Sequence, residues 1–282
     1  MEAKKKMGNV RIKKILAYTI LTIGALSMIL PFIWMLLTSF MTNSQIFAYP
    51  PEIVPEEFKW QNYIDVNNKI PLFRYFINSL IVSIATVIGQ VITCSLAAYA
   101  FARLKFKHKD ILFLAFLGTM MIPPQVNIIP LFFLMRELHW VDTYWALIVP
   151  GIFGGFGIFL LRQWFLTFPS ELEDAAKIDG CNPLTTFWYI ALPLALPAIV
   201  TLGIFSFITS WNSFMWPLIV TNADSMKTLP VGLAAFKGSF RETTEWAQLM
   251  AASIISIIPV VIVFMLGQKY FIKGIMAGAI KE

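Results

Sequence analysis

Long apolar stretches without charged residues run through this chain of 282 residues and limit what it can fold into. Apolar residues make up 58% of the sequence and charged residues only 13%. A helix needs about 20 apolar residues to cross a bilayer core of about 30 Å. We therefore expect an integral membrane protein. Six stretches are long enough to span, at residues 15–38, 77–101, 111–134, 143–162, 194–219 and 247–268.

The apolar runs favour helices over membrane-spanning strands. A run such as "ILFLAFLGTMMIP" does not alternate between apolar and polar residues, as a strand that crosses a membrane does. A helix also satisfies its own backbone hydrogen bonds within hydrocarbon. The expected fold class is therefore an all-α membrane protein with six transmembrane helices.

The distribution of basic residues predicts the orientation. Fifteen of the 22 Lys and Arg residues fall in segments that are cytoplasmic if both termini are cytoplasmic. The net charge of +6 then reflects topology and contact with membrane lipid, and no nucleic-acid partner is expected. The expected parts are a cytoplasmic N-terminal segment 1–14, a first transmembrane helix 15–38, an outer loop 39–76, a core of five transmembrane helices 77–268 and a cytoplasmic tail 269–282.

The core is expected to contain a cytoplasmic loop 169–193, named the acidic loop below, and an outer loop 221–245. The two long outer loops show no obvious helical periodicity, and loops of such length are often functional.

The acidic loop departs from the basic character of the other cytoplasmic segments. Within "SELEDAAKIDGCNP", Ser170 followed by Glu173 matches a capping box and predicts a helix start. Gly180 is expected to end this helix at positive φ, where a side chain would be strained and would clash at the turn. Asn182 and Pro183 predict the start of a second helix. The pattern favours a compact acidic protrusion; the alternative is an amphipathic segment on the membrane surface, which its acidic face disfavours.

Polar and aromatic residues interrupt two of the apolar stretches. Pro123 and Pro124 break the third stretch, and amides and rings follow there and in the fifth. Neutral amides and aromatic faces suit an uncharged, hydroxyl-rich solute, although such residues also hold transmembrane helices together. Gly151 and Gly155 have GxxxG spacing, which predicts close helix packing. The candidate pathway residues are Gln125, Asn127, Trp211, Asn212, Phe214 and Trp216.

The residues leave three classes of function open. The chain contains no G-x-x-x-x-G-K-[ST] phosphate loop, so an ATP-driven transporter needs a separate ATPase. An ion-driven secondary transporter of a neutral solute is the alternative; the proline-broken helix favours it, but the absence of charged residues inside the spans argues against it. A membrane scaffold or receptor accounts for the spans but not for the polar, broken segment.

Part of the acidic loop resembles the EAA motif of ABC importer permeases. Asp174 stands where that family usually has Glu, and Cys181 where it usually has Ala. The segments "MIPPQVNIIPLFFLM", "WNSFMWPLIV", "TLPVGL" and "GIMAGAIKE" also resemble the six-span permeases of the maltose and glycerol-phosphate systems, so the likeness covers nearly the whole chain after residue 15. The residues that carry the motif are Asp174, Ala175, Ala176, Asp179, Gly180, Ile190, Leu192 and Pro193.

The resemblance implies a type I ABC importer permease fold in the cell (inner) membrane of a bacterium or archaeon. Such a permease is not an enzyme: it forms half of a pathway for a sugar or oligosaccharide. Its partners are a second related permease, two copies of a cytoplasmic ABC ATPase and an extracytoplasmic sugar-binding protein. No cofactor is expected on this chain, since the partner ATPase binds ATP and Mg.

The resemblance also implies residue roles. The second outer loop should reach toward the binding protein, and the tail should run along the ATPase. Gly274 and Gly278 disfavour a stable extended helix in the tail, since each interior glycine costs about 1 kcal/mol relative to alanine. The tail is therefore expected to be ordered by contact. The residues expected to couple to the ATPase are Glu173, Asp174, Ala175, Ala176, Asp179, Gly180, Ala277 and Gly278.

Overall fold

A computed structural model describes the chain apart from residues 1, 56, 235, 237–243 and 280–282. In the described part all regular structure is helical, in agreement with the expected class. The chain forms two compact units: residues 1–70 with 235–255, and residues 71–234 with 256–282. The last helix, α15 (Trp246–Ala279), contributes residues to both.

The first unit begins with a long helix, α1 (Glu2–Thr38). Asn62 holds the segment that follows α1: its buried side-chain amide donates to the carbonyls of Ser39 and Met41, each at 2.9 Å. The ring of Phe40 contacts those of Phe58, Trp60 and Tyr63. These contacts form a small apolar cluster with its own polar anchor.

The outer loop 39–76 is more helical than expected. It contains α2 (Asn43–Ile46) and α3 (Gln61–Lys69), and α4 (Leu72–Arg103) begins within it. A capping box at Thr42 and Gln45 starts α2. Helices α2 and α3 have only 4 and 9 residues, too few for a period of 3.6 to stand out in the sequence.

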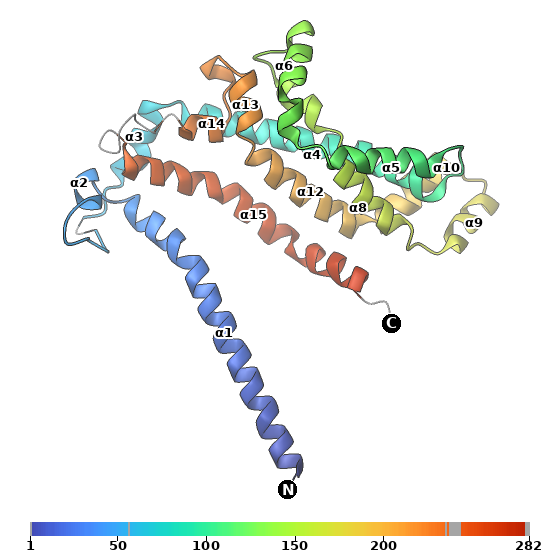
Figure 1. The fold of residues 1–282 in the computed structure, drawn as a ribbon, viewed down its shortest axis with the longest axis horizontal. Helices are drawn as coiled ribbons and strands as arrows, with labels where there is room; N and C mark the ends of the chain where they lie inside the picture. The colour runs from blue at the N-terminus through green and yellow to red at the C-terminus, as the bar shows by residue number, and fades with distance from the viewer. Residues whose placement is uncertain (1, 56, 235, 237–243, 280–282) are drawn as a thin grey trace. The chain divides into compact units, whose positions relative to one another are not determined.

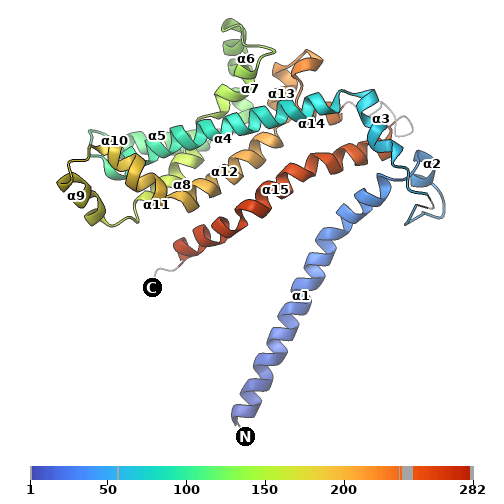
Figure 2. The same ribbon diagram turned by 180° about the vertical axis from the view of Figure 1, so that it is seen from behind.

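The second unit is built around α4. This helix packs against α8 (Gly155–Phe165) and α12 (Leu196–Trp211), and α5 (Lys109–Met120) packs against α8 (Figures 1 and 2). A Cβ at Gly157 would lie 2.8 Å from Cys94 Sγ and 3.1 Å from Leu202 Cδ1. Glycine at this position therefore allows α8, α4 and α12 to pack closely.

Three candidate spans in the described residues are single helices and three more are bent pairs. The single helices cover 13–38, 72–103 and 246–270, so up to six spans result if each bent pair counts as one. The break expected at Pro123 and Pro124 is present: α5 and the following η1 (Pro124–Asn127) and α6 (Ile128–Glu137) meet at 91°. Proline lacks the N–H that a continuous helix requires there.

The fourth and fifth stretches are also interrupted. Residues 143–162 divide into α7 (Tyr144–Ile148), η2 (Val149–Gly151) and α8, with a bend of 40°. The expected stretch 194–219 is not one helix: α12 ends at Trp211, and α13 (Met215–Val220) follows after a gap. Pro217 and the poor helix formers Asn212 and Ser213 explain the interruption.

Gly151 and Gly155 allow close packing, but not as a single GxxxG face. Gly151 ends η2 and Gly155 starts α8. A Cβ on Gly151 would lie 3.0 Å from Thr86 of α4, whereas one on Gly155 would lie 2.7 Å from Met120 of α5. The two glycines therefore make room for different neighbours.

The tail is helical, contrary to the expectation from its glycines. Helix α15 continues through Gly274 and Gly278 to Ala279. Extending an existing helix adds one hydrogen bond for each residue fixed, and Ile275, Met276 and Ala277 tolerate a helix well. These terms offset the two glycines.

Candidate functional site

The acidic loop folds into two short helices joined at a glycine. Helix α9 (Ser170–Ile178) ends with Gly180 at φ +81°, and α10 (Pro183–Thr186) follows. The N–H of Cys181 donates to Ala176 O at 2.9 Å, and that of Gly180 to Lys177 O at 3.0 Å. This pair of bonds is a Schellman motif, so the predicted helix end at Gly180 with positive φ is confirmed.

Asn182 starts the second helix as predicted. Its side-chain oxygen accepts from the backbone N–H of Thr185 at 2.8 Å, and Pro183 occupies the first turn. The chain continues through η3 (Phe187–Ala191), a π-helical segment, and α11 (Leu192–Leu194). The acidic loop is therefore a chain of short, defined turns.

The predicted capping box at Ser170 is absent. Pro169 precedes the first residue of α9, and no side chain caps the helix. Glu173 instead accepts a hydrogen bond from Arg103 Nε at 2.7 Å. A carboxylate binds a charged guanidinium more strongly than a neutral backbone N–H, which explains why the pair replaces the cap.

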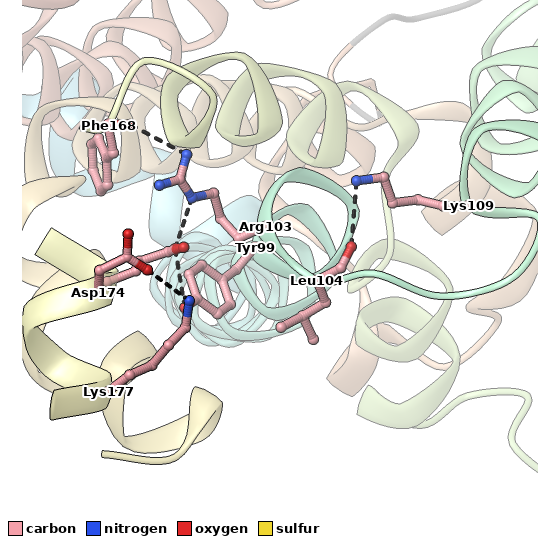
Figure 3. A network of polar contacts seen from close by, with 8 residues as sticks. Tyr99, Arg103, Leu104, Lys109, Phe168, Asp174 and Lys177 are labelled. Carbon is pink, nitrogen blue, oxygen red and sulfur yellow. Dashed lines mark hydrogen bonds and ion pairs between the residues drawn. The ribbon is translucent and has the colours of Figure 1, made fainter. Parts of the chain in front are cut away.

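Arg103 links the acidic loop to the end of α4. Its Nη1 donates to Phe168 O at 3.2 Å, and the Tyr99 hydroxyl donates to Glu173 at 3.4 Å (Figure 3). The side chains of Arg103 and Glu173 are 12% and 22% exposed. The Tyr99 ring lies 5.6 Å from that of Phe165. The ion pair is therefore largely shielded from solvent and lies next to packed aromatic side chains.

The outward face of the acidic loop mixes charge with exposed apolar side chains. Asp174 Oδ1 accepts from Lys177 Nζ at 2.9 Å, and both side chains are exposed. Ile178 is 86% exposed and Tyr189 80% exposed. Of the predicted coupling residues, Ala176 is buried, whereas Asp174, Ala175, Asp179 and Gly180 are exposed. Apolar side chains grouped on a surface in this way indicate an interaction site.

A cavity of about 470 Å³ opens beside α4 in the second unit. Helices α4 and α12, the broken segment at Pro124 and the start of α13 contribute to its wall. Three of the predicted pathway residues line it: Gln125, Phe214 and Trp216. The other polar lining residues are Ser79, Thr86, Gln90, Ser206, Thr209, Ser210, Ser213 and Thr228.

A family model described as "Binding-protein-dependent transport system inner membrane component" matches residues 90–276, which include both the acidic loop and most of the cavity wall. The chain belongs to this family. It is a permease subunit of a binding-protein-dependent ABC importer and a multi-pass membrane protein.

Curated relatives match nearly the full length of this permease. It is 35% identical over 93% of its length to the arabinooligosaccharides transport system permease protein AraQ of Halalkalibacterium halodurans, covering 96% of that protein. It is 32% identical over 93% of its length to the sn-glycerol-3-phosphate transport system permease protein UgpE of Yersinia pestis, covering 95% of that protein.

The fold of the permease also matches a solved structure. A chain of a bacterial ABC transporter involved in the import of the acidic polysaccharide alginate superposes with a TM-score of 0.82. The sequences are 25% identical, and the match covers 93% of this chain and 97% of the other. The fold is therefore that of an ABC importer permease.

Three predicted pathway residues do not line the cavity. Trp211 is buried in the core of the permease, where its ring stacks on Phe207 and its Nε1 donates to Ser256 O at 3.0 Å. Asn212 donates its side-chain amide to Ile208 O at 2.9 Å. Asn127 is exposed at the end of η1. Each lies directly next to a lining residue, and the breaks in the helices decide which side chains face the cavity.

Some residues that shape the cavity wall and hold the acidic loop carry no signal in the sequence. Ser206 donates to Gln90 Oε1, and Gln90 Nε2 donates to Gly151 O at 2.6 Å, so Gln90 is fixed in the cavity wall. In the sequence, Arg103 is only one of the basic residues of a cytoplasmic segment. Tyr99 and Arg103 are spaced four apart on one helix face, but nothing local to them identifies Glu173, 70 positions away, as their partner.

The tail and the second outer loop are described in part. Ala277 and Gly278 lie in the last turns of α15, where only the backbone is described. The part of the second outer loop expected to reach the binding protein also lies largely outside the described residues. Its start is described: η4 (Asp224–Met226) and α14 (Leu229–Ala234). Asn78 donates to the carbonyls of Ser225 and Lys227 at 2.9 and 2.8 Å.

Proposed function

We propose that this permease imports a sugar or oligosaccharide and that its acidic loop transmits movement of an ATPase to the pathway. The proposal rests on two features of the acidic loop. Its surface presents exposed charged and apolar side chains, and the ion pair between Glu173 and Arg103 joins it to α4. A surface that binds a moving partner has to be joined rigidly to the part that it moves. The Schellman motif and the Arg103–Glu173 pair supply this rigidity.

The proposed assembly follows the family. This chain pairs with a second, related permease to form a heterodimer, with two copies of a cytoplasmic ABC ATPase and an extracytoplasmic sugar-binding protein. ATP and Mg bind to the ATPase, in keeping with the absence of a phosphate-loop motif from this sequence. Six spans place both termini in the cytoplasm of a bacterial or archaeal cell, with residues 169–193 and the tail facing the ATPase. The coupling residues are the eight assigned from the sequence, joined by Arg103.

Purification with its neighbours tests this function. The permease, expressed with its genomic partners and purified through a tag on this chain, should bring down an ATPase whose ATP hydrolysis is stimulated by the loaded binding protein in reconstituted membranes. Solute uptake that depends on an ion gradient, without a bound ATPase, would contradict the proposal.

Asp174→Ala is expected to lower transport without abolishing assembly. The exposed Asp174–Lys177 pair contributes at most about 1 kcal/mol to folding, so its loss leaves the permease intact. The carboxylate is instead proposed to reach a cation on the ATPase. Uptake and ATPase co-purification should be measured in parallel, with Glu171→Ala, an exposed carboxylate of the same helix, as the control. Asp174→Glu should keep full transport, and equal losses in Glu171→Ala and Asp174→Ala would count against a specific contact.

A further inference from the structure

We propose that the cavity of the second unit is a subsite for one uncharged sugar ring of the transported solute, held by this subunit itself. The proposal rests on the importer function proposed above and adds to it a location and a charge class. The cavity volume of about 470 Å³ falls within the range of about 300 to 1,000 Å³ that is typical of small-molecule sites.

Free hydrogen-bonding groups face this cavity. Among the described residues, no hydrogen bond engages the side chains of Gln125, Thr209, Ser210 or Ser213, although all four line the wall. Hydroxyl and amide groups both donate and accept. A sugar hydroxyl also does both, so these groups match a ring that carries several hydroxyls.

The same wall holds two further hydroxyls that lack partners. The side-chain oxygens of Thr86 and Thr228 are buried and make no hydrogen bond in the described structure. Both residues line the cavity, on α4 and on the segment before α14. A buried polar group without a partner is uncommon and calls for an explanation. A bound solute that draws these hydroxyls into contact provides one.

Two aromatic side chains supply the apolar part of the site. Trp216 Nε1 donates to Ala146 O at 2.9 Å, which fixes the indole ring, and Phe214 lies two residues before it. The C–H face of a sugar ring packs on an aromatic ring while its hydroxyls bind polar groups at the rim. Gln90, held by Ser206 and Gly151, fixes another part of the wall before solute arrives. Such preorganisation lowers the free-energy cost of binding.

The lining residues determine the charge class. No described residue that lines the cavity carries a charged side chain. A phosphate or uronate group placed here would lose its hydration without gaining a cation, a strongly unfavourable transfer. The subsite therefore fits a neutral sugar, unlike the sn-glycerol-3-phosphate and alginate named for two of the similar proteins.

A transport panel with the reconstituted complex tests the charge class. The permease with its partner permease, ATPase and binding protein should be given radiolabelled arabinotriose, maltotriose and cellotriose, and in parallel glycerol 3-phosphate and a trimer from alginate. Uptake of at least one neutral probe and of neither anionic probe is expected. A complex that hydrolyses ATP with its partners but takes up an anionic probe, or none of the neutral ones, overturns the inference while the importer function stands.

Substitutions test the location of the subsite. With the transported probe, Gln125→Ala and Ser213→Ala should each raise the half-saturating concentration, or lower maximal uptake, by about threefold to tenfold, as expected for a lost neutral hydrogen bond. The yield of the assembled complex should stay unchanged, which shows that the variants fold and assemble. Thr119→Ala is the matched control, because Thr119 is exposed and bonds only to Phe116 O of its own helix. Uptake by both cavity variants equal to that of the control would overturn the location.

Discussion

Glu173→Ala should leave a permease that inserts in the membrane but couples poorly to its ATPase, with uptake reduced tenfold or more. The change removes the partner of Arg103 at the junction of α9 and α4. A hydrogen bond to a charged group contributes about 1.5 to 3 kcal/mol, and the guanidinium would be left largely shielded from water. The expected effect is larger than that of a lost helix cap, the role that the sequence indicated.

The loss should act on coupling because of where the pair lies. Arg103 also donates to Phe168 O just before α9, so a single guanidinium holds the start of the acidic loop at two points. Without Glu173, α9 can shift relative to α4 when the ATPase moves. ATP hydrolysis should then become less dependent on transport, while the amount of bound ATPase changes less.

A set of charge variants separates positioning from folding. Arg103→Ala should lose at least as much coupling as Glu173→Ala, because it also removes the hydrogen bond to Phe168 O. The double variant should be no worse than Arg103→Ala, since that change already breaks the pair. Arg103→Lys should restore part of the coupling, since it keeps the charge but not the fork that also reaches Phe168. The measurement is the ratio of uptake to ATP hydrolysis in proteoliposomes. Fully additive losses in the double variant would show that the two residues act independently.

The residues that were predictable from the sequence act through their immediate neighbours. Gly180 and Asn182 were assigned correctly because helix ends depend on backbone conformation and on hydrogen bonds a few residues away. Pro123 and Pro124 broke a helix for the same local reason. The all-helical class was predictable because each apolar run is long enough for a helix to cross a membrane.

What the sequence did not indicate depends on contacts distant in the chain. Glu173 had a plausible partner at Ser170, and only the fold brings Arg103 within 2.7 Å of it. Trp211 and Trp216 lie on the same apolar stretch, yet the end of α12 at Trp211 sends one into the core and the other to the cavity. The position of a helix break within one turn decides such differences, and propensities do not locate it that finely.

Gly180→Val should abolish the stable association of the ATPase, whereas Gly180→Asn should be close to the unmodified protein. At φ +81° an ordinary side chain is strained by roughly 1 to 2 kcal/mol, and a β-branched one is disfavoured further. Asparagine tolerates the left-handed region, so it keeps the Schellman motif.

The reason for this effect is backbone strain, without a clash inside the chain. No heavy atom of the described residues outside the immediate neighbours lies within 4 Å of a Cβ built on Gly180, so the clash expected from the sequence is wrong. Relief of the strain in Gly180→Val requires the turn to change, which breaks the bonds from Cys181 and Gly180 to α9 and re-aims α10. Both variants add a side chain, but only valine is incompatible with the left-handed backbone conformation. Comparing them therefore separates the effect of that conformation from the effect of adding a side chain.

Three measurements on each variant complete the test. The yield of folded permease and its thermal midpoint should be nearly the same for both variants, since Gly180 is exposed and a side chain there meets no packed atoms of the described residues. Co-purified ATPase should be lost in Gly180→Val and kept in Gly180→Asn, and stimulated ATP hydrolysis should follow the same order. If valine retained the ATPase and full stimulation, the conformation at Gly180 would not matter for docking, and the acidic loop would lose its proposed role as the contact that drives transport.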